Sequence, residues 1–472
     1  MVLLGHSGCG KTTLTRLING LIPEFYAGDF YGDIYIEGKN TDDLYLSDLS
    51  EVVGSVFQDP RSQFFTMDTT AEMAFSCENA GMKQQEIVDG ILRTAELLDM
   101  EYLLERNIFE LSSGEKQMVA IGSVCTYSPK ILVFDEPSAN LDLEATYRLK
   151  RAIIGLKKKG YTIVISEHRL HYLTDVCDRA VFMKRGKIER IFSREELSRF
   201  TNSLANTRGM RSVHLENIAI EKKAKHFGDM VLKLENLSFC YEKNKNIFTH
   251  LNLEVKAGQI IGIIGHNGVG KSTFLELLCG LKKECEGKIY FQDQAANAKK
   301  RQKQSYYVMQ DSDCQLFTES VEKELYLENA QNEMLCLKGH EILDRLGLAE
   351  YEKCHPAALS GGQKQRLCIA VSCMKDAQVI CFDEPTSGLD YESMMSISSI
   401  FTDLAKQGKV LLVVTHDFEF LTQCCTHILY MENARRNEFF PIQEKAASEL
   451  LEMMSNRATV SLNDPKKRKR VI

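Results

Sequence analysis

The chain has 472 residues, of which 44% are hydrophobic and 26% charged, and its formal net charge is −7. This length is too great for one hydrophobic core, and the composition is that of a globular protein. The net negative charge gives no overall reason to expect nucleic acid as a partner. One strong basic run, "PKKRKRVI" at the C-terminus, could bind an anionic surface or be a solvated terminus.

The cysteines and the apolar runs further narrow the class of protein. Fifteen cysteines in a chain of this size do not indicate a disulfide scaffold, and we interpret them as reduced thiols, several of them small core residues. The longest apolar runs, such as "QIIGIIG" and "VLLVV", are of strand length, whereas a membrane span needs about 20 residues. We therefore do not expect the chain to cross a membrane by itself.

An internal repeat organises the chain. "GHSGCGKTT" at 5–13 returns as "GHNGVGKST" at 265–273, and "LSSGEKQ" returns as "LSGGQKQ". "LVFDEPSANLD" likewise returns as "ICFDEPTSGLD". Positions 111 and 359, 135 and 383, and 168 and 416 all differ by 248. Two copies of one domain therefore follow one another along the chain.

Strand-type runs alternate with amphipathic helical stretches in both copies, which predicts an α/β fold with a largely parallel sheet. We predict a first domain over 1–205, a polar linker over 206–229, a second domain over 230–440 and a tail over 441–472.

The two copies differ in the length that precedes the glycine-rich loop. The second copy begins near Val231, 40 residues before Lys271, whereas 10 residues precede Lys11. The first copy is therefore expected to have an incomplete N-terminal β-subdomain, and the chain to be a fragment or to start at a misplaced codon. On this view the first copy binds ATP less tightly than the second and is less stable than a version with the missing segment restored.

GxxxxGK[ST] predicts a loop whose backbone N–H groups and following helix N-terminus hold phosphate. Lys11 and Lys271 are expected to reach the β- and γ-phosphates, and the hydroxyls of Thr12 and Ser272 to bind Mg²⁺. The complete predicted loops are Gly5, His6, Ser7, Gly8, Cys9, Gly10, Lys11, Thr12 and Thr13, and Gly265, His266, Asn267, Gly268, Val269, Gly270, Lys271, Ser272 and Thr273.

"ILVFDEP" and "VICFDEP" are apolar strands that end in two carboxylates. Asp135 and Asp383 are expected to hold Mg²⁺ beside the phosphate loop. Glu136 and Glu384, one residue later, are placed to polarise the attacking water. Positioning and charge neutralisation are what phosphoryl transfer requires, so the pair predicts nucleotide hydrolysis.

With these motifs the chain resembles two fused ATPase domains of the ATP-binding cassette (ABC) superfamily, whose fold is that of P-loop NTPases with an added helical subdomain. "LSSGE" and "LSGGQ" resemble its signature motif, although Ser113 and Glu115 replace the commoner Gly and Gln. The resemblance implies that one copy's phosphate loop and the other's signature hold each ATP. Lys11 would thus face Ser360, Gly361 and Gly362, and Lys271 would face Ser112, Ser113 and Gly114.

The resemblance implies further roles. Gln58 and Gln310 match the loop glutamine that senses Mg²⁺ and the membrane partner, and they are also predicted metal ligands. The matches to the switch histidine are His168 and His416, and those to the D-loop are Asp142 and Asp390. Tyr241 matches the aromatic residue that stacks on adenine in the second copy.

The segments after Gln58 and Gln310 share a "Q-x-F-T" pattern and resemble the ATPases of energy-coupling factor (ECF) importers. Glu72 and Glu324 are expected to lie in the grooves that receive the membrane partner. Conventional ABC importers and soluble tandem ABC proteins of the ribosome are the alternatives. The linker of about 24 residues is shorter than the charged helical linkers usual in the latter class.

This resemblance implies ATP and Mg²⁺ as cofactors. It also implies a transmembrane coupling subunit and a separate substrate-binding membrane subunit as partners, with no nucleic acid. The two domains would pair within the chain, which would be peripheral on the cytoplasmic side of the cell membrane. The sequence does not name the transported solute.

Overall fold

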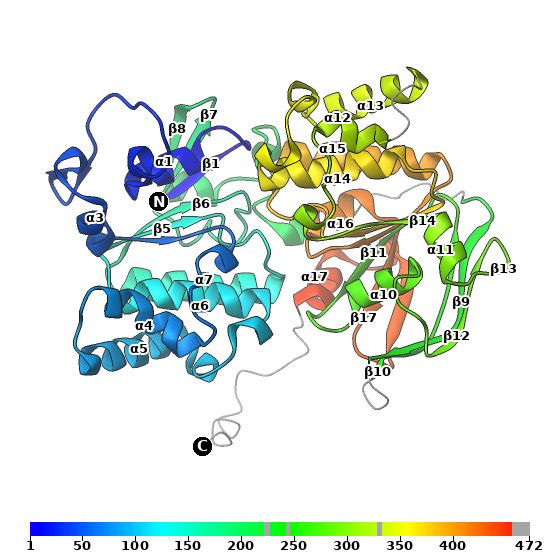
Figure 1. The fold of residues 1–472 in the computed structure, drawn as a ribbon, viewed down its shortest axis with the longest axis horizontal. Helices are drawn as coiled ribbons and strands as arrows, with labels where there is room; N and C mark the ends of the chain where they lie inside the picture. The colour runs from blue at the N-terminus through cyan, green and yellow to red at the C-terminus, as the bar shows by residue number, and fades with distance from the viewer. Residues whose placement is uncertain (221–226, 242–245, 328–332, 456–472) are drawn as a thin grey trace. The chain divides into compact units, whose positions relative to one another are not determined.

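The structure is a computed structural model that describes residues 1–472 except 221–226, 242–245, 328–332 and 456–472. The basic run at 465–472 and parts of the predicted linker and tail lie outside the described residues. The chain divides into two compact units, each with its own sheet (Figure 1). Unit 1 contains Met1–Ile218, Asp311–Met374 and Pro385–Ile400, and unit 2 contains Ala219–Gln310, Lys375–Glu384 and Phe401–Ile472.

Unit 1 contains a six-stranded sheet in the order β4-β5-β6-β1-β7-β8. The first five of these strands run parallel, and β8 pairs antiparallel to β7. In the inner strands β1, β5 and β6 most residues are valine, isoleucine, leucine or phenylalanine and most are buried, as the covered centre of a parallel sheet requires, whereas the edge strand β8 is largely exposed. The strands are β1 Val2–Gly5, β4 Val53–Val56, β5 Ile131–Asp135, β6 Thr162–Ser166, β7 Arg179–Lys184 and β8 Lys187–Ser193.

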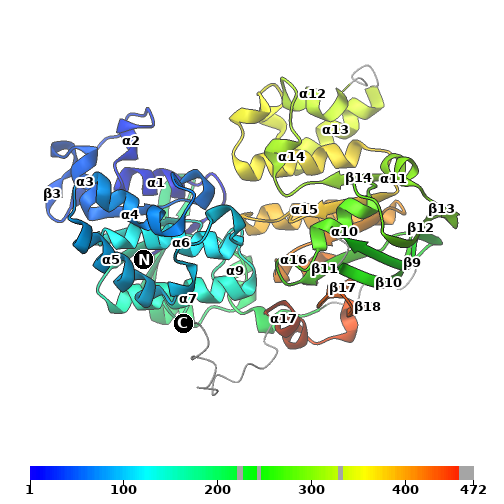
Figure 2. The ribbon, with the colours of Figure 1, turned by 60° about the horizontal axis from the view of Figure 1, so that its bottom comes forward.

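Helices surround this sheet, and α4, α5 and α6 pack on one another beside it (Figure 2). The helices of residues 1–218 are α1 Lys11–Ile18, α2 Leu21–Glu24, α3 Leu46–Val52, α4 Thr69–Asn79, α5 Gln84–Leu98, α6 Ser113–Thr126, α7 Leu143–Lys158, α8 Arg194–Ser198 and α9 Asn202–Asn206. Unit 1 also holds α12 Val321–Tyr326, α13 Glu333–Arg345, α14 Gly361–Met374 and most of α15 Tyr391–Lys406. Met210 and Val213, from the predicted linker, join its hydrophobic core.

Unit 2 repeats the arrangement with a six-stranded sheet in the order β14-β15-β16-β11-β17-β18, again with an antiparallel last strand. Its strands are β11 Ile260–Gly265, β14 Ser305–Val308, β15 Val379–Asp383, β16 Val410–Val414, β17 His427–Met431 and β18 Asn437–Pro441. Its helices are α10 Lys271–Leu278, α11 Ala298–Gln304, α16 Phe418–Cys424 and α17 Ala447–Ser455. The mainly parallel sheets and the P-loop NTPase fold predicted from the sequence are confirmed.

The β-subdomain differs between the copies as the sequence predicts. Unit 2 has a four-stranded antiparallel sheet in the order β10-β9-β12-β13, with β9 Met230–Cys240, β10 Asn246–Lys256, β12 Glu286–Phe291 and β13 Gln294–Ala295. In the described residues of the first copy, β2 Tyr35–Ile36 and β3 Lys39–Asn40 form a two-stranded sheet at the matching place in the sequence.

Glu72 and Glu324 do not face a groove, and this expectation is wrong. Both side chains are buried, with 3% of each residue exposed. The Oε2 atom of Glu72 accepts hydrogen bonds from the N–H groups of Phe65 and Thr66, at 3.0 and 2.9 Å, and from the Thr66 hydroxyl at 2.9 Å. The carboxylate therefore fixes the loop before α4, because it satisfies backbone donors that would otherwise be unpaired.

Glu324 makes the same three contacts, with the N–H groups of Phe317 and Thr318 and with the Thr318 hydroxyl, at 3.2, 2.9 and 2.7 Å. In both copies the phenylalanine whose N–H is held points outward, since Phe65 is 74% and Phe317 78% exposed. The acidic residue thus positions an exposed aromatic ring.

Replacing Glu72 by alanine is expected to lower the free energy of unfolding by about 1–3 kcal/mol, since it leaves buried donors without an acceptor. Glu78→Ala is the matched control, because Glu78 lies on the same helix and is exposed. Urea denaturation followed by circular dichroism measures both variants. Equal unfolding midpoints for the two variants would show that the Glu72 contacts do not stabilise the fold.

Candidate functional site

Each phosphate-loop sequence lies between a central strand and a helix. The loop in the first copy connects β1 to α1 and that in the second connects β11 to α10. Gly5 and Gly265 have φ values of 147° and 150°, and a Cβ atom at either position would collide with a carbonyl oxygen of the neighbouring strand. Only glycine fits here, which is why the loop leaves the strand where it does.

Lys11 is buried beneath its own loop. Its Nζ atom donates to the carbonyl oxygens of Gly5 at 3.0 Å and His6 at 3.3 Å, and lies 3.2 Å from Nε2 of His168. Lys271 repeats the first two contacts, with Gly265 at 2.8 Å and His266 at 2.9 Å. The ammonium group is therefore held at a loop of the kind whose backbone N–H groups bind an anion.

Glu136 is held in a strained backbone conformation, and Glu384 repeats it. Their φ values are 44° and 52°, in the left-handed region that a residue with a Cβ rarely adopts. The N–H of Glu136 donates to Ser166 at 2.9 Å, and that of Glu384 donates to Val414 at 2.9 Å. In both copies a backbone hydrogen bond to the neighbouring strand thus holds the glutamate in its strained conformation. Backbone strain of this kind is typical of functional sites.

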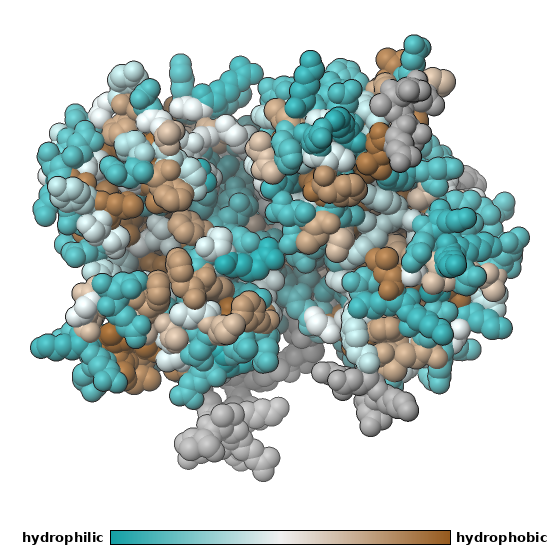
Figure 3. All heavy atoms as spheres, viewed as in Figure 1, coloured by the Kyte–Doolittle hydropathy of each residue, from teal (hydrophilic) through white to brown (hydrophobic). Residues whose placement is uncertain are grey.

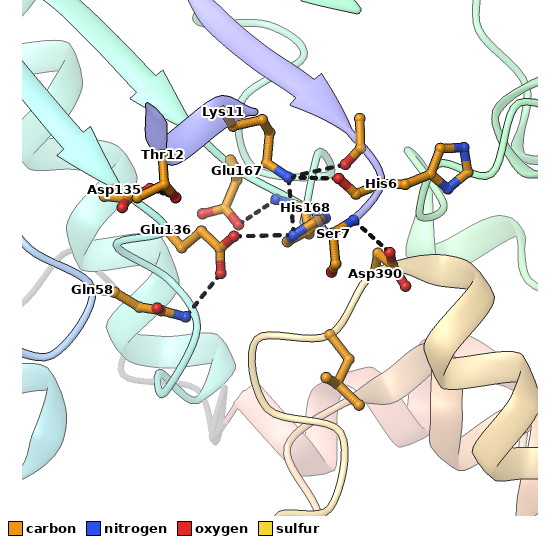
Figure 4. Close-up of polar contacts among 12 residues, drawn as sticks. His6, Ser7, Lys11, Thr12, Gln58, Asp135, Glu136, Glu167, His168 and Asp390 are labelled. Atoms are coloured by element: carbon orange, nitrogen blue, oxygen red, sulfur yellow. Dashed lines mark hydrogen bonds and ion pairs between the residues drawn. The ribbon is translucent and has the colours of Figure 1, made fainter. Parts of the chain in front are cut away.

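The Glu136 carboxylate contacts two predicted site residues (Figure 4). Its Oε1 lies 3.0 Å from Nε2 of His168, and its Oε2 accepts from the Gln58 amide at 2.9 Å. Burial opposes ionisation of Glu136, but His168 and Lys11 outweigh it and lower its pKa. The carboxylate is therefore kept charged in a largely water-excluded position.

Asp135 is the residue at the end of β5, where its Oδ1 accepts a hydrogen bond from the Thr12 hydroxyl at 3.2 Å. Burial raises the pKa of Asp135, and the neighbouring Glu136 raises it further. A carboxylate and a hydroxyl oxygen at this separation match the ligand preference of Mg²⁺. The donor set of the first copy therefore fits the predicted metal.

The second copy brings the matching residues together with longer contacts. Nε2 of His416 lies 3.5 Å from Oε1 of Glu384, and the His416 N–H donates to Oε2 at 3.2 Å. Burial raises the pKa of Asp383, while its hydrogen bond with Ser272 acts against this rise. Gln310 follows β14 in this copy, as Gln58 follows β4 in the first.

Tyr307 contacts the predicted metal-binding aspartate of the second copy, which the sequence did not indicate. Its hydroxyl donates to Oδ2 of Asp383 at 3.0 Å. The first copy has Ser55 at the matching position, and Ser55 accepts a hydrogen bond from Asn19 at 2.9 Å instead. Only the pairing of β14 with β15 reveals the contact, since the two residues are 76 positions apart.

The sequence motifs do not identify Glu167 as a site residue of the first copy. Its charge beside the apolar strand residues of "VISEH" is nevertheless a signal that its carboxylate has hydrogen-bond partners. Its carboxylate accepts from the N–H groups of His168 and Arg169, at 2.7 and 3.1 Å, and from the buried Tyr172 hydroxyl at 2.6 Å. The second copy has Thr415 here. Glu167 therefore holds the backbone at His168, the predicted switch histidine of the first copy.

The signature sequences begin helices α6 and α14. Ser112 and Glu115 form a reciprocal cap, in which Glu115 accepts from the Ser112 N–H at 2.8 Å and Ser112 accepts from the Glu115 N–H at 3.3 Å. Ser360 and Gln363 form the same pair at 2.8 and 3.4 Å. The acidic residue of the first signature thus performs the same capping role as the amide of the second.

The remaining predicted residues lie at loop and helix starts. Asp142 accepts from the Ala145 N–H at 2.8 Å and caps α7. Asp390 accepts from Ser393 at 2.8 Å and, within unit 1, from the Ser7 N–H at 2.6 Å (Figure 4). Tyr241 follows β9, and its hydroxyl lies 2.9 Å from the Thr273 hydroxyl of the second phosphate loop.

Comparison with known families identifies the family to which the chain belongs. The profile of the family described as "ABC transporter" matches residues 1–139 and 248–387. The chain belongs to the ABC transporter family. It is an ABC ATPase with tandem domains, so the family resemblance seen in the sequence is confirmed.

Curated relatives of this ABC ATPase match it along most of its length. A Treponema denticola protein with the provisional name ABC transporter ATP-binding protein is 39% identical over 446 residues, which cover 94% of this chain and 91% of that protein. A Bacillus subtilis protein, provisionally named HMP/thiamine import ATP-binding protein YkoD, is 29% identical over 462 residues, covering 92% and 84% respectively.

Solved tandem ABC proteins have the same fold. One chain, from a model of ribosome-bound archaeal Pelota and ABCE1, gives a TM-score of 0.67 at 23% identity, covering 93% of this chain and 74% of that chain. The RNase-L inhibitor structure gives a TM-score of 0.64 at 23% identity, and the match covers 96% of this chain and 88% of that chain. At this identity the likeness concerns the fold alone. Among the described residues of this ABC ATPase, no helix has the length and apolar character needed to cross a membrane.

Replacing Tyr307 by phenylalanine is expected to destabilise the protein at pH 7 by about 1–3 kcal/mol, because it removes a donor from the buried Asp383 carboxylate. The Tyr307 hydroxyl favours the charged form and lowers the pKa of Asp383 against the effect of burial. Without it that pKa rises further, so the loss of stability is full at pH 7 and shrinks as the pH falls and Asp383 becomes protonated.

Urea denaturation at pH 7 and at pH 5 measures this difference. Tyr430→Phe, in another strand of the same sheet, is the control for loss of a tyrosine hydroxyl. A loss of stability for Tyr307→Phe that is the same at both pH values would contradict the assignment to Asp383.

Proposed function

We propose that this ABC ATPase is the motor subunit of an ABC importer of the ECF type. It hydrolyses ATP to drive uptake of a vitamin, a metal ion or a similar small solute through separate membrane subunits. The catalytic domains are 1–205 and 230–440, joined by 206–229 and followed by the tail 441–472. The chain is peripheral on the cytoplasmic side of the membrane, held there by a transmembrane coupling subunit.

The observation that carries the catalytic part is the contact between a glutamate and a histidine at the carboxyl edge of each sheet. In the first copy Nε2 of His168 lies 3.2 Å from Nζ of Lys11 and 3.0 Å from Oε1 of Glu136, so the histidine connects the lysine to the glutamate. Glu136 and Glu384 act as the bases that orient the attacking water, and His168 and His416 contact the γ-phosphate.

The phosphate loops 5–13 and 265–273 hold the polyphosphate through backbone N–H groups and their lysines. Mg²⁺ would be held by Thr12 and Asp135 with Gln58, and by Ser272 and Asp383 with Gln310. When bound, the ion neutralises charge that develops on the phosphate oxygens. The protein's own contribution is to keep Glu136 charged, to exclude water and to fix the direction of the carboxylate through the strained backbone.

The signature residues complete the proposed sites. The N-termini of α6 and α14 offer backbone N–H groups and a positive dipole end to an anion. In the proposal, Ser112, Ser113 and Gly114 serve the nucleotide of the second copy. Ser360, Gly361 and Gly362 serve that of the first, and Tyr241 stacks on adenine in the second copy.

Glu136→Gln and Glu384→Gln are each expected to lower steady-state ATP turnover by about 100-fold or more, because a general base contributes 10²–10⁴-fold. Binding of a fluorescent ATP analogue should be retained, since the amide keeps the side chain's size. Glu78→Gln, an exposed change, is the control for hydrolysis. Unchanged turnover in either variant within the complete transporter would contradict the equal catalytic role of the two copies.

Two findings support the importer part of the proposal. The relative from Bacillus subtilis is named as an import ATP-binding protein for HMP/thiamine, and it matches 92% of this chain. The loops after Gln58 and Gln310 each present an exposed phenylalanine, Phe65 and Phe317. The backbone N–H of each phenylalanine donates to a buried glutamate. A single exposed ring can enter an apolar site on a partner.

Around Phe65 the surface of unit 1 carries further apolar side chains. Phe65 stacks on Phe75, with ring centroids 4.9 Å apart, and Met67 is exposed beside it in the sequence. Hydrophobic residues are visible as brown patches over the part of unit 1 that carries α4 and α5 (Figure 3). Clusters of exposed apolar side chains commonly mark binding surfaces for partners.

Phe65→Ser and Phe317→Ser are each expected to lower co-purification with the proposed transmembrane subunit by several-fold. Nucleotide affinity should be unchanged, since neither ring belongs to the phosphate site. Phe25→Ser removes a similarly exposed ring elsewhere and is the control. Unchanged complex formation in both variants would contradict the docking role, and sedimentation of the wild-type chain with ribosomes instead of membranes would contradict the importer proposal.

A further inference from the structure

Two cysteine thiols lie in contact on the surface of the β-subdomain of unit 2. The Sγ atoms of Cys240 and Cys285 are 2.9 Å apart. The N–H of Cys240 donates to Sγ of Cys285 at 3.2 Å, and the Cys285 thiol donates to the Cys240 carbonyl oxygen at 3.5 Å. Cys285 is exposed and Cys240 is partly exposed, so small molecules can reach both sulfur atoms.

The backbone fixes this contact. Cys240 ends β9, and Cys285 directly precedes β12, which pairs with β9. The N–H of Cys285 donates to the carbonyl oxygen of Ser238 at 3.0 Å, which continues the ladder between the two strands. The thiols therefore meet because the sheet brings them together, and their approach requires no rearrangement of the chain.

Access separates this pair from other thiols of the chain. Cys279, which directly follows α10, and Cys381, in β15, also interact through their side chains, but both are buried. Oxidants attack thiols that are both reachable and able to ionise, so burial protects that second pair. Cys240 and Cys285 combine contact with exposure.

The thiol pair is joined to the predicted adenine contact by one peptide bond. Tyr241 follows Cys240, and its hydroxyl lies 2.9 Å from that of Thr273 in the phosphate loop. Lys282, three residues before Cys285, donates to the same hydroxyl at 3.0 Å, and its Nζ lies 4.6 Å from the centre of the ring. Tyr241 is thus joined to Cys240 through the chain, and it contacts Lys282, which lies near Cys285 in the sequence.

We propose that Cys240 and Cys285 form a reversible disulfide in response to peroxide, and that this disulfide weakens ATP binding at the second phosphate loop. The thiolate of Cys285 attacks one oxygen of hydrogen peroxide, which gives a sulfenic acid and, after proton uptake, one water. The Cys240 sulfur then attacks the sulfenic sulfur and displaces a second water. In total two thiols and one peroxide yield one disulfide and two waters.

The effect on ATP follows from what the crosslink would hold in place. In the proposed function Tyr241 stacks on adenine, so the position of its ring affects how tightly the second phosphate loop binds ATP. A covalent bond between Cys240 and Cys285 removes freedom from the residues on both sides of the ring, Tyr241 and Lys282. This consequence rests on the proposed function of the second copy, whereas formation of the disulfide does not.

Disulfide formation is tested on the full chain. The reduced protein is treated with hydrogen peroxide, free thiols are blocked with N-ethylmaleimide, and the unreduced digest is mapped by mass spectrometry. We expect a crosslinked peptide pair containing Cys240 and Cys285 that dithiothreitol separates. Absence of this pair, with both cysteines recovered as blocked thiols or as irreversible oxidation products, would overturn the proposal.

The link to ATP is tested by titrating a fluorescent ATP analogue into the Lys11→Ala variant, which isolates the second loop. Peroxide is expected to raise Kd about fivefold or more, since stacking on a base is worth about 1–3 kcal/mol. Dithiothreitol should reverse the rise. Cys285→Ser in the same background should be insensitive to peroxide, while Cys354→Ser, which removes another partly exposed thiol, should respond as its parent does.

Each result decides one part of the proposal. A crosslink with unchanged Kd would overturn the coupling to ATP and leave the disulfide. An equal rise of Kd in Cys285→Ser would assign the effect to another thiol and overturn the coupling. If the reduced Lys11→Ala variant binds no analogue, the proposed function of the second loop fails, and the peptide map still decides whether the disulfide forms.

Discussion

The parallel arrangement of the strands is the constraint on which both sites depend. Because five strands of each six-stranded sheet point the same way, their carboxyl ends meet at one edge. The phosphate loop leaves the central strand there, and the Asp-Glu pair and the histidine leave the next strands. The close approach of Gly5 and Gly265 to the adjacent strand then fixes where each loop turns. Residues more than 150 positions apart, such as Lys11 and His168, can therefore be 3.2 Å apart.

Within this shared frame the two copies stabilise their acidic groups differently. His168 and Lys11 favour the charged form of Glu136, and Glu167 accepts a hydrogen bond from the backbone N–H of His168. The second copy lacks that glutamate, and the contact from His416 to Glu384 is longer, at 3.5 Å. It has instead a tyrosine hydroxyl that donates to Asp383, its predicted metal-binding aspartate. Two sequences with the same motifs thus reach the same arrangement of charges through different supporting residues.

The sequence was sufficient for features that follow from local pattern or from repetition. The two copies, the phosphate loops, the Asp-Glu pairs and the parallel sheet could all be predicted, since each has a fixed spacing and occurs twice. Contacts that depend on pairing between distant strands could not. Tyr307 meets Asp383, and Cys240 meets Cys285, only because separate strands lie side by side. The left-handed conformation of Glu136 was equally hidden, since a glutamate carries no signal for a positive φ.

Glu72 and Glu324 show how repetition alone can mislead. An acidic residue recurs at the same place in both copies, in the segment that resembles the partner-facing surface of ABC importers, and this repetition predicts a group that faces the partner. Each carboxylate instead accepts three hydrogen bonds inside the protein. A buried charge costs less when it satisfies several backbone donors, and the loop it orders can then present an apolar ring to solvent. The repeated feature at the surface is therefore the phenylalanine, and the repeated acid is the reason that the ring has a defined position.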